Sequence, residues 1–167
     1  MTAKQLSVFI ENRQGRLGEV LAVLKNNDIN ILSLSLADTT EYGLLRILVN
    51  NPQKGKEVLI DKGFSSMITD ILVIKIPHKS GSLQEILQLI SDSNISIEYM
   101  YGLSIDGADA SIAMKTSDIL GACKILKDNN IETIYFREKD SKEINSKYIH
   151  DVDNWGQVYR IIKSLNK

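Results

Sequence analysis

The fold of this chain is decided by the stretch Gly15-Arg16-Leu17-Gly18-Glu19-Val20-Leu21, which returns further along as Gly81-Ser82-Leu83-Gln84-Glu85-Ile86-Leu87. The same offset carries Ile29-Asn30-Ile31 onto Ile95-Ser96-Ile97. Because no gap is needed between the two matches, the register indicates two copies of one small structural unit. Two similar modules side by side form a pseudo-symmetric interface, which is a natural place for a ligand site.

The first copy has the pattern of two helices among four strands. Apolar residues at helical spacing predict a helix from Leu17 to Leu24, and Pro52 begins a second helix, which Gly63 ends. Apolar alternation between turn residues predicts the strands. These strands are expected over 6–10, 29–37, 42–49 and 64–70.

The second copy repeats the order β-α-β-β-α-β. Ser117 is expected to cap its second helix, which would run to Lys127. This order defines the α+β class, as two tandem ferredoxin-like modules with antiparallel sheets and both helices on one face. The modules are expected over 1–70 and 71–136, and they should pack rigidly because no linker separates them. The second set of strands is expected over 71–76, 95–105, 108–115 and 131–136, with a helix over 81–91.

The C-terminal segment, 137–167, lies outside the repeat. It begins with a polar, charge-rich link. From Asp153 onward an amphipathic helix is expected, with Trp155, Val158, Ile162 and Leu165 on one face. This helix would either dock on the body of the protein or bind a partner, including a second chain.

The composition is that of an ordinary globular protein, with 167 residues, 43% of them hydrophobic. Twenty basic residues balance 21 acidic ones, which argues against nucleic acid or an anionic membrane as partner. No apolar run approaches the roughly 20 residues of a membrane span, and no signal-peptide core is present. The single cysteine, Cys123, excludes an internal disulfide. We therefore expect a cytoplasmic protein.

No catalytic set or metal site is apparent in the sequence. The only histidines, His78 and His150, belong to no metal-binding or nucleophile pattern. Acidic residues are scattered, and no pair of them recurs in both copies. Cys123 falls on the inner stripe of its helix and is interpreted as a structural thiol. We therefore expect neither an enzyme nor a bound metal or cofactor.

The strongest functional signal is the junction of strand, turn and helix, because it occurs twice. Gly15 and Gly81 permit a tight turn and close approach of the backbone to another group. The helix begins directly afterwards, so free N–H groups and the positive end of the helix dipole point outward. That geometry suits a carboxylate or a phosphate. The alternative is that each glycine serves the turn alone.

These residues carry a family resemblance. The run from Asn12 to Leu17 before a helix, with Ile29-Asn30-Ile31 opening the next strand, resembles an ACT domain. The run from His78 to Leu83, with Ile95-Ser96-Ile97, resembles a second one. Ile97 to Tyr101 is similar to the second module of stand-alone tandem ACT proteins. The resemblance covers about residues 5–136.

The resemblance implies a small effector, most often an amino acid, bound between paired modules. In that family the turn before the first helix of one module meets the start of the second strand of its neighbour. Tyr99 and Tyr101 would either line the effector pocket or cover the open sheet face or a dimer interface. Carried over, one candidate site joins Asn12, Arg13, Gln14, Gly15, Arg16 and Leu17 to Ile95, Ser96 and Ile97. The pseudo-symmetric site joins His78, Lys79, Ser80, Gly81, Ser82 and Leu83 to Ile29, Asn30 and Ile31.

The turns also depart from the family pattern. Many members have proline before the turn glycine, where this chain has Gln14 and Ser80. His78 replaces an acidic residue that is frequent early in the turn, so another group must bind the effector's ammonium. The two sites are therefore expected to differ, and one could be empty.

Three other functions fit the same ferredoxin-like fold. An acylphosphatase-like hydrolase would need an arginine and an asparagine in a phosphate-binding loop, which the run from Asn12 to Arg16 contains. The second copy has no arginine in its turn, and no nearby acid or base completes a site. An RNA-recognition module would display aromatic residues on its third strands, which here carry none at those positions. An effector-free interaction scaffold is also open. The expected function is a non-catalytic amino-acid-binding regulator, a homodimer that acts on a separate enzyme or regulator.

Overall fold

The computed structural model describes residues 2–38, 42–106 and 108–134. Within them the order β-α-β-β-α-β occurs twice, so the predicted α+β class with antiparallel sheets is confirmed. The predicted helix within 137–167 lies outside the described residues. The elements are β1 (Ala3–Glu11), α1 (Arg16–Asn26), β2 (Ile31–Asp38), β3 (Tyr42–Val49), α2 (Pro52–Asp61), β4 (Ser65–Pro77), α3 (Ser82–Asp92), β5 (Ile97–Asp106), β6 (Asp109–Thr116), α4 (Ile119–Asp128) and β7 (Thr133–Ile134).

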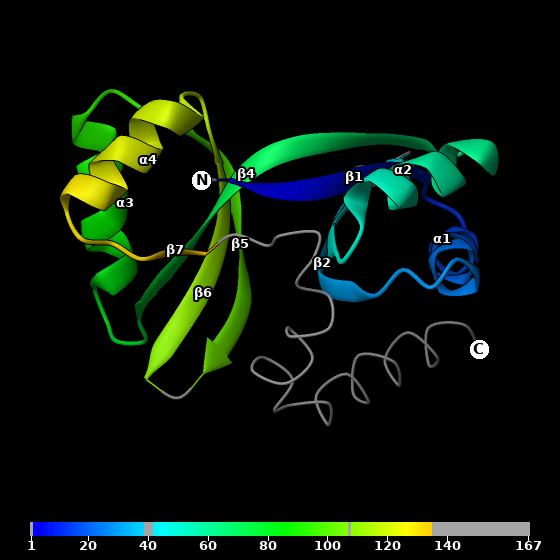
Figure 1. The fold of residues 1–167 in the computed structure, drawn as a ribbon, viewed down its shortest axis with the longest axis horizontal. Coiled ribbons are helices and arrows are strands. Elements are labelled where there is room, and N and C mark those ends of the chain that lie inside the picture. The colour runs from blue at the N-terminus through cyan, green and yellow to red at the C-terminus, as the bar shows by residue number, and fades with distance from the viewer. Residues whose placement is uncertain (1, 39–41, 107, 135–167) are drawn as a thin grey trace.

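The two strands expected at the junction of the copies are one continuous strand, β4, of 13 residues. Its first half pairs with β1, as far as the pair of Ala3 and Ile71. Its second half pairs with β6, from Leu72 onward, and also with β7. The strand order is β2-β3-β1-β4-β6-β5, so β4 belongs to both sheets (Figure 1). The boundary expected between residues 70 and 71 falls inside this strand and stays a prediction.

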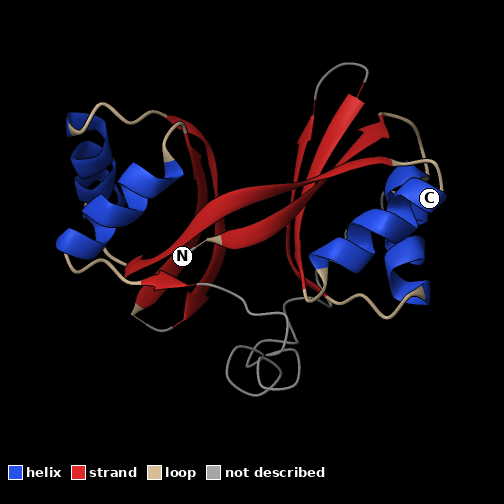
Figure 2. Cartoon of the chain, turned by 45° about the horizontal axis from the view of Figure 1, so that its top comes forward, coloured by secondary structure: helices blue, strands red, loops and turns tan. Residues whose placement is uncertain are grey.

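The helices lie on the two outer sides of the molecule, and the sheets lie between them (Figure 2). Alternate residues of each strand point toward the helices and form one core in each module. Leu6, Val8 and Ile10 of β1 are buried in the first core. Their counterparts in the second copy, Leu72, Ile74 and Ile76 of β4, are buried in the second core. The repeat in the sequence is therefore a repeat of the core.

The second helix of the second module begins one residue later than the sequence suggests. Its N-cap is Asp118, whose carboxylate accepts a hydrogen bond from the Gly121 N–H at 2.9 Å, so the assignment of Ser117 was wrong. The Ser117 hydroxyl instead accepts a hydrogen bond from the Ser96 N–H at 3.0 Å. Serine and aspartate are both good caps, and the neighbouring strand decides between them by engaging the serine.

The faces of the sheets that carry no helices pack against each other. Ala3, Leu48 and Ile71 from the first sheet and Val73 and Ala113 from the second form a third buried cluster. Apolar contact between sheets at this position holds the two modules as one body.

Polar bonds also cross between the sheets, centred on the fully buried side chain of Gln5. Its amide nitrogen donates to the Tyr99 hydroxyl and to the Ser7 hydroxyl, each at 2.9 Å. Its amide oxygen accepts a hydrogen bond from the Tyr101 hydroxyl at 2.8 Å. The Arg46 guanidinium lies 4.0 Å from the centre of the Tyr99 ring, in cation–π contact. Buried polar groups need partners, and here each sheet supplies partners for the other.

The change Tyr101→Phe should lower the free energy of unfolding by about 1–3 kcal/mol, because it leaves the buried Gln5 amide oxygen without its donor. Chemical denaturation of both proteins measures the difference. Tyr42→Phe is the matched control, since Tyr42 is 56% exposed. Removing its hydroxyl should change the free energy of unfolding by about 0.5 kcal/mol or less. Equal stability of the Tyr101→Phe and unmodified proteins would contradict the importance of this bond.

Stability should also fall at alkaline pH because of Tyr101. Burial, together with the neighbouring Tyr99, raises the pKa of Tyr101 above its ordinary value. The unfolded chain therefore loses this proton first, near pH 10, and the free energy of unfolding declines as pH rises further. Denaturation curves between pH 9 and pH 11 should show a shallower decline for Tyr101→Phe than for the unmodified protein. Parallel declines would contradict this assignment.

Candidate functional site

The first helix of each module begins directly after a turn glycine, as the sequence predicts, and both glycines have a left-handed backbone. Gly15 has φ 89° and Gly81 has φ 91°, and neither helix start receives a side-chain cap. The other two helices are capped, α2 by Asn51, which accepts from Lys54, and α4 by Asp118. The starts of α1 and α3 therefore keep backbone N–H groups without a side-chain acceptor, and such groups favour an anion.

The residue directly after each glycine holds a buried polar atom that forms no hydrogen bond within the described structure. In the first module this atom is Arg16 Nε, which still lies within ion-pair distance of the Glu11 carboxylate, and in the second it is the Ser82 hydroxyl. The Ser82 side chain is buried, and that of Arg16 is 18% exposed. The Ser82 hydroxyl therefore has no protein partner among the described residues, and a buried polar group of this kind is usually satisfied by water or a ligand.

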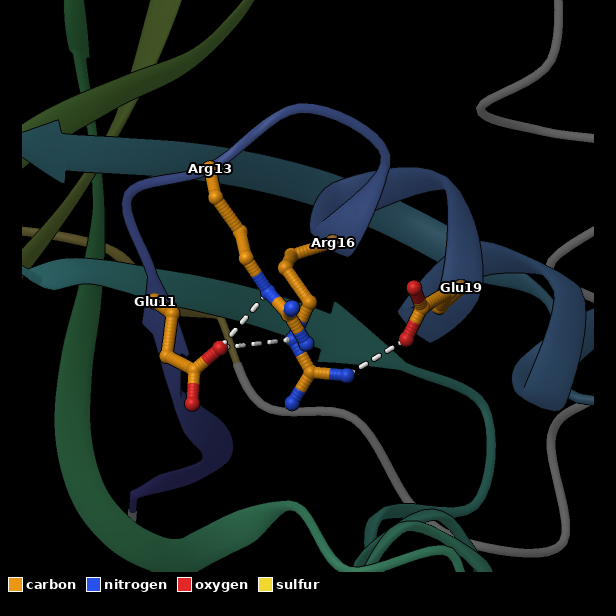
Figure 3. A network of polar contacts seen from close by, with 4 residues as sticks. All are labelled: Glu11, Arg13, Arg16 and Glu19. Atoms are coloured by element: carbon orange, nitrogen blue, oxygen red, sulfur yellow. Dashed lines mark hydrogen bonds and ion pairs between the residues drawn. The ribbon is translucent and has the colours of Figure 1, made fainter.

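The first turn is held by a chain of ion pairs between Glu11, Arg13, Arg16 and Glu19 (Figure 3). Arg13 Nε lies 2.7 Å from the Glu11 carboxylate, and Arg16 Nε lies 3.6 Å from the same oxygen. A terminal nitrogen of the Arg16 guanidinium forms an ion pair with the Glu19 carboxylate. The central carbon of the same guanidinium lies 4.5 Å from the centre of the Phe64 ring. The network sets the Arg16 side chain beside the helix start.

The second turn has different chemistry. Pro77 stands where the first module has Glu11, and Ser82 where it has Arg16. The side chains of His78, Lys79 and Ser80 are exposed, and the His78 N–H donates to the Ala108 carbonyl at 2.7 Å. The two turns therefore share a backbone but differ in charge.

The starts of the second strands are already bonded to the ends of the third strands. The Asn30 N–H donates to the Asn50 side chain at 3.0 Å, and the Asn50 N–H donates to the Asn30 carbonyl at 3.1 Å. Ser96 and Ser117 form the same pair of bonds in the second module, at 3.0 and 2.9 Å. The sequence analysis missed Asn50, and it assigned Ser117 to the helix cap instead of to this bond. The available signal was a polar residue directly after each third strand.

A groove of about 460 Å³ lies beside the start of β2. Ile29 and Ile31 give it an apolar side, and Lys25 and Asp28 bring one positive and one negative charge. In the second copy the two charged positions are occupied by Ser91 and Asn94. The charged groove is therefore a property of the first module. Its other lining residues are Leu21, Leu24 and Asn30.

Within one module the turn and the strand start lie at opposite ends of the third strand. In the first module Glu11 pairs with Tyr42, the first residue of β3, and Ile31 pairs with Val49, its last. The second module repeats this, with Pro77 opposite Asp109 and Ile97 opposite Thr116. The turn and the start of the second strand are thus about 23 Å apart along each sheet.

Between modules the two groups are also separated along β4. The first turn lies just beyond the pair of Phe9 and Ser65, and the start of β5 lies just beyond the pair of Leu72 and Met114, in the same direction. Seven residues of an extended strand span about 23 Å. One chain therefore does not bring the turn of one module beside the strand start of the other. A site that joins them stays a prediction, and it would draw on a second chain.

Tyr99 and Tyr101 lie between the two sheets, where both hydroxyls bond to Gln5. Of the alternatives weighed from the sequence, this position matches side chains that cover the open sheet face. A direct role for either tyrosine in ligand binding stays a prediction.

The described residues contain neither a membrane-spanning helix nor a cluster of metal ligands. Across 2–38, 42–106 and 108–134, no helix is long and apolar enough to cross a membrane. In the same residues no group of three or more His, Cys, Asp or Glu side chains could hold a metal ion.

Comparison with known proteins identifies the family. Residues 1–145 match the family described as the ACT domain pair, and this chain belongs to that family. The protein BT0572 from Bacteroides thetaiotaomicron is 35% identical, with a TM-score of 0.76 over 80% of this chain and 92% of that one. No curated protein matches the chain.

More distant structures share the fold alone. The ligand-free regulatory subunit of aspartate kinase from Thermus thermophilus is 14% identical, with a TM-score of 0.56 over 75% of this chain and 90% of that one. The corresponding subunit from Thermus flavus is 13% identical, with a TM-score of 0.55 over the same shares. The resemblance to ACT domains inferred from the two turns is confirmed.

Gly15→Ala and Gly81→Ala should each lower the free energy of unfolding by about 1–2 kcal/mol, since a left-handed backbone strains any residue with a side chain. Neither position has a neighbour within 4 Å of an added Cβ, so strain alone is measured. Gly18→Ala is the matched control, because Gly18 lies inside α1 with the same open space. Alanine there should leave stability unchanged or raise it by up to about 1 kcal/mol. Urea denaturation compares the three variants, and equal effects would contradict the strain.

Proposed function

We propose that this protein is a non-catalytic, cytoplasmic regulator that binds an amino acid between ACT modules and acts on a separate enzyme or regulator. Its membership of the ACT domain pair family supports a regulatory role. The observation that carries the amino-acid proposal is the groove at the start of β2, with opposite charges beside apolar side chains.

The groove supplies the group that the turns lack. A free amino acid at neutral pH carries an ammonium and a carboxylate. Asp28 would bind the ammonium, and Ile29 and Ile31 would contact an apolar effector side chain. Lys25, which lines the same groove, would attract the effector's carboxylate. Ser91 and Asn94 stand at these two charged positions in the second module. We therefore propose that the effector binds in the groove of the first module.

The helix start would complete the site. The N–H groups after Gly15, which have no side-chain cap, and the positive Arg16 guanidinium beside them suit the effector's carboxylate. Since these groups lie far from the groove of their own module, they would come from a second chain. β2 ends the order of the described strands, so it offers these strands an edge for pairing beside the groove. This arrangement favours a homodimer with the effector between its chains.

Thermal unfolding against each of the twenty amino acids at millimolar concentration tests the proposal. A ligand at 100 times its dissociation constant should add about 2.7 kcal/mol of stability, enough to raise the melting temperature by several degrees. We expect a selective shift with a small subset of amino acids. No shift would favour the effector-free scaffold, and hydrolysis of an acyl phosphate would favour the hydrolase.

Asp28→Asn should weaken binding of the selected amino acid about tenfold or more, because it removes the ammonium's charged partner. Asp128→Asn is the matched control: it makes the same change at the end of α4, away from the groove. Titration calorimetry measures both affinities. If the two variants bind equally well, the effector does not occupy the groove.

A further inference from the structure

Within the described residues, the open face of the first sheet is covered over only part of its length. Near Ala3 and Ile71 the second sheet packs on it. Farther along, Phe9 is 46% exposed and Met67 is 48% exposed. Both belong to this face, because Phe9 lies an even number of residues from Ala3 and Met67 pairs with Ser7 between them. We call Phe9, its partner Leu44 and Met67 the open-face patch.

The fold does not require this patch to be apolar. In the second module Lys75 stands where the first has Phe9, and its partner Ser111 stands where the first has Leu44. Lys75 also forms an ion pair with Asp109 at 3.0 Å. The equivalent pair of the second module is therefore polar. An exposed apolar cluster in one copy alone marks a contact surface.

The third member of the patch differs from its counterpart in coverage. Met67 lies opposite Ser7, and Ile134 lies opposite Val73, the equivalent position of the second module. Ile134 packs in the cluster between the sheets, whereas Met67 is half exposed. The second module thus covers its apolar residue at this position, and the described part of the first module leaves its own open.

We propose that residues 153–165 of the same chain dock on the open-face patch as an amphipathic helix. Trp155, Val158, Ile162 and Leu165 recur at helical spacing and would form its apolar stripe. A helix of 13 residues is about 20 Å long, enough to cross the three strands of the patch, which span about 10 Å. The chain contains this surface once and this segment once.

The chain leaves the described structure at a suitable place. Ile134, the last residue that the structure describes, pairs with Val73, and its side chain packs against the cluster between the open faces. From Val73 to Met67 is about 20 Å along β4. Residues 135–152 could span up to about 60 Å, so they reach the patch with slack. The segment therefore needs no second chain to bind there, and the inference does not depend on the proposed effector.

Fluorescence of the single tryptophan, Trp155, reports directly on the segment in the full-length protein. We expect blue-shifted emission and protection from acrylamide quenching. The double change Phe9→Lys and Leu44→Ser, which installs the polar pair of the second module, should shift emission to the red and raise quenching several-fold. Leu36→Lys with Ile60→Ser is the matched control, because these side chains are 47% and 49% exposed elsewhere on the module. The control should retain the protection.

A second variant changes the segment and leaves the body intact. Val158→Lys with Ile162→Lys should expose Trp155 to the same extent as the patch variant does. The two modules should stay folded, which an unchanged melting temperature would show. Exposed Trp155 in the unmodified protein would overturn the proposal, as would protection that survives both double variants or equal loss in the control. Protection that disappears on dilution would assign the patch to a second copy and would also overturn it.

Discussion

Strand β4 hydrogen-bonds in both sheets, and the rest of the structure depends on that sharing. With β1 on its first half and β6 on its second, the modules cannot separate without breaking a strand. The shared strand also turns the two open faces toward each other. Gln5 can therefore lie fully buried, because Tyr99 and Tyr101 reach its amide from the other sheet. Apolar packing alone would leave that amide without partners.

The core could be predicted from the sequence because it depends on local spacing. The repeat carried Leu6 onto Leu72 and Val8 onto Ile74, and both pairs are buried in equivalent cores. The turns at Gly15 and Gly81 were predicted for the same reason. What could not be predicted depends on contacts between distant segments. The bond from Ser96 that engages Ser117, and so moves the cap to Asp118, requires the pairing of β5 with β6.

The candidate site shows the same limit. The uncapped helix starts followed from the turn sequence, whereas the charged groove beside β2 was missed, because Lys25 and Asp28 belong to different local patterns. The two modules agree in their cores and differ on their surfaces. Arg16 against Ser82, Asp28 against Asn94, and Phe9 against Lys75 each change charge or polarity on an unchanged backbone. Duplication thus supplied one scaffold with two separately adaptable surfaces.

The continuous strand β4 also limits how such a chain can change in length. Side chains alternate between the faces of a strand, and Ile71 and Val73 face the sheet interface while Leu72 and Ile74 face the helices of the second module. A single inserted residue in this strand would reverse every later side chain and turn the second module's helices toward the first sheet. Insertions or deletions in β4 should therefore be tolerated only when they change its length by an even number of residues.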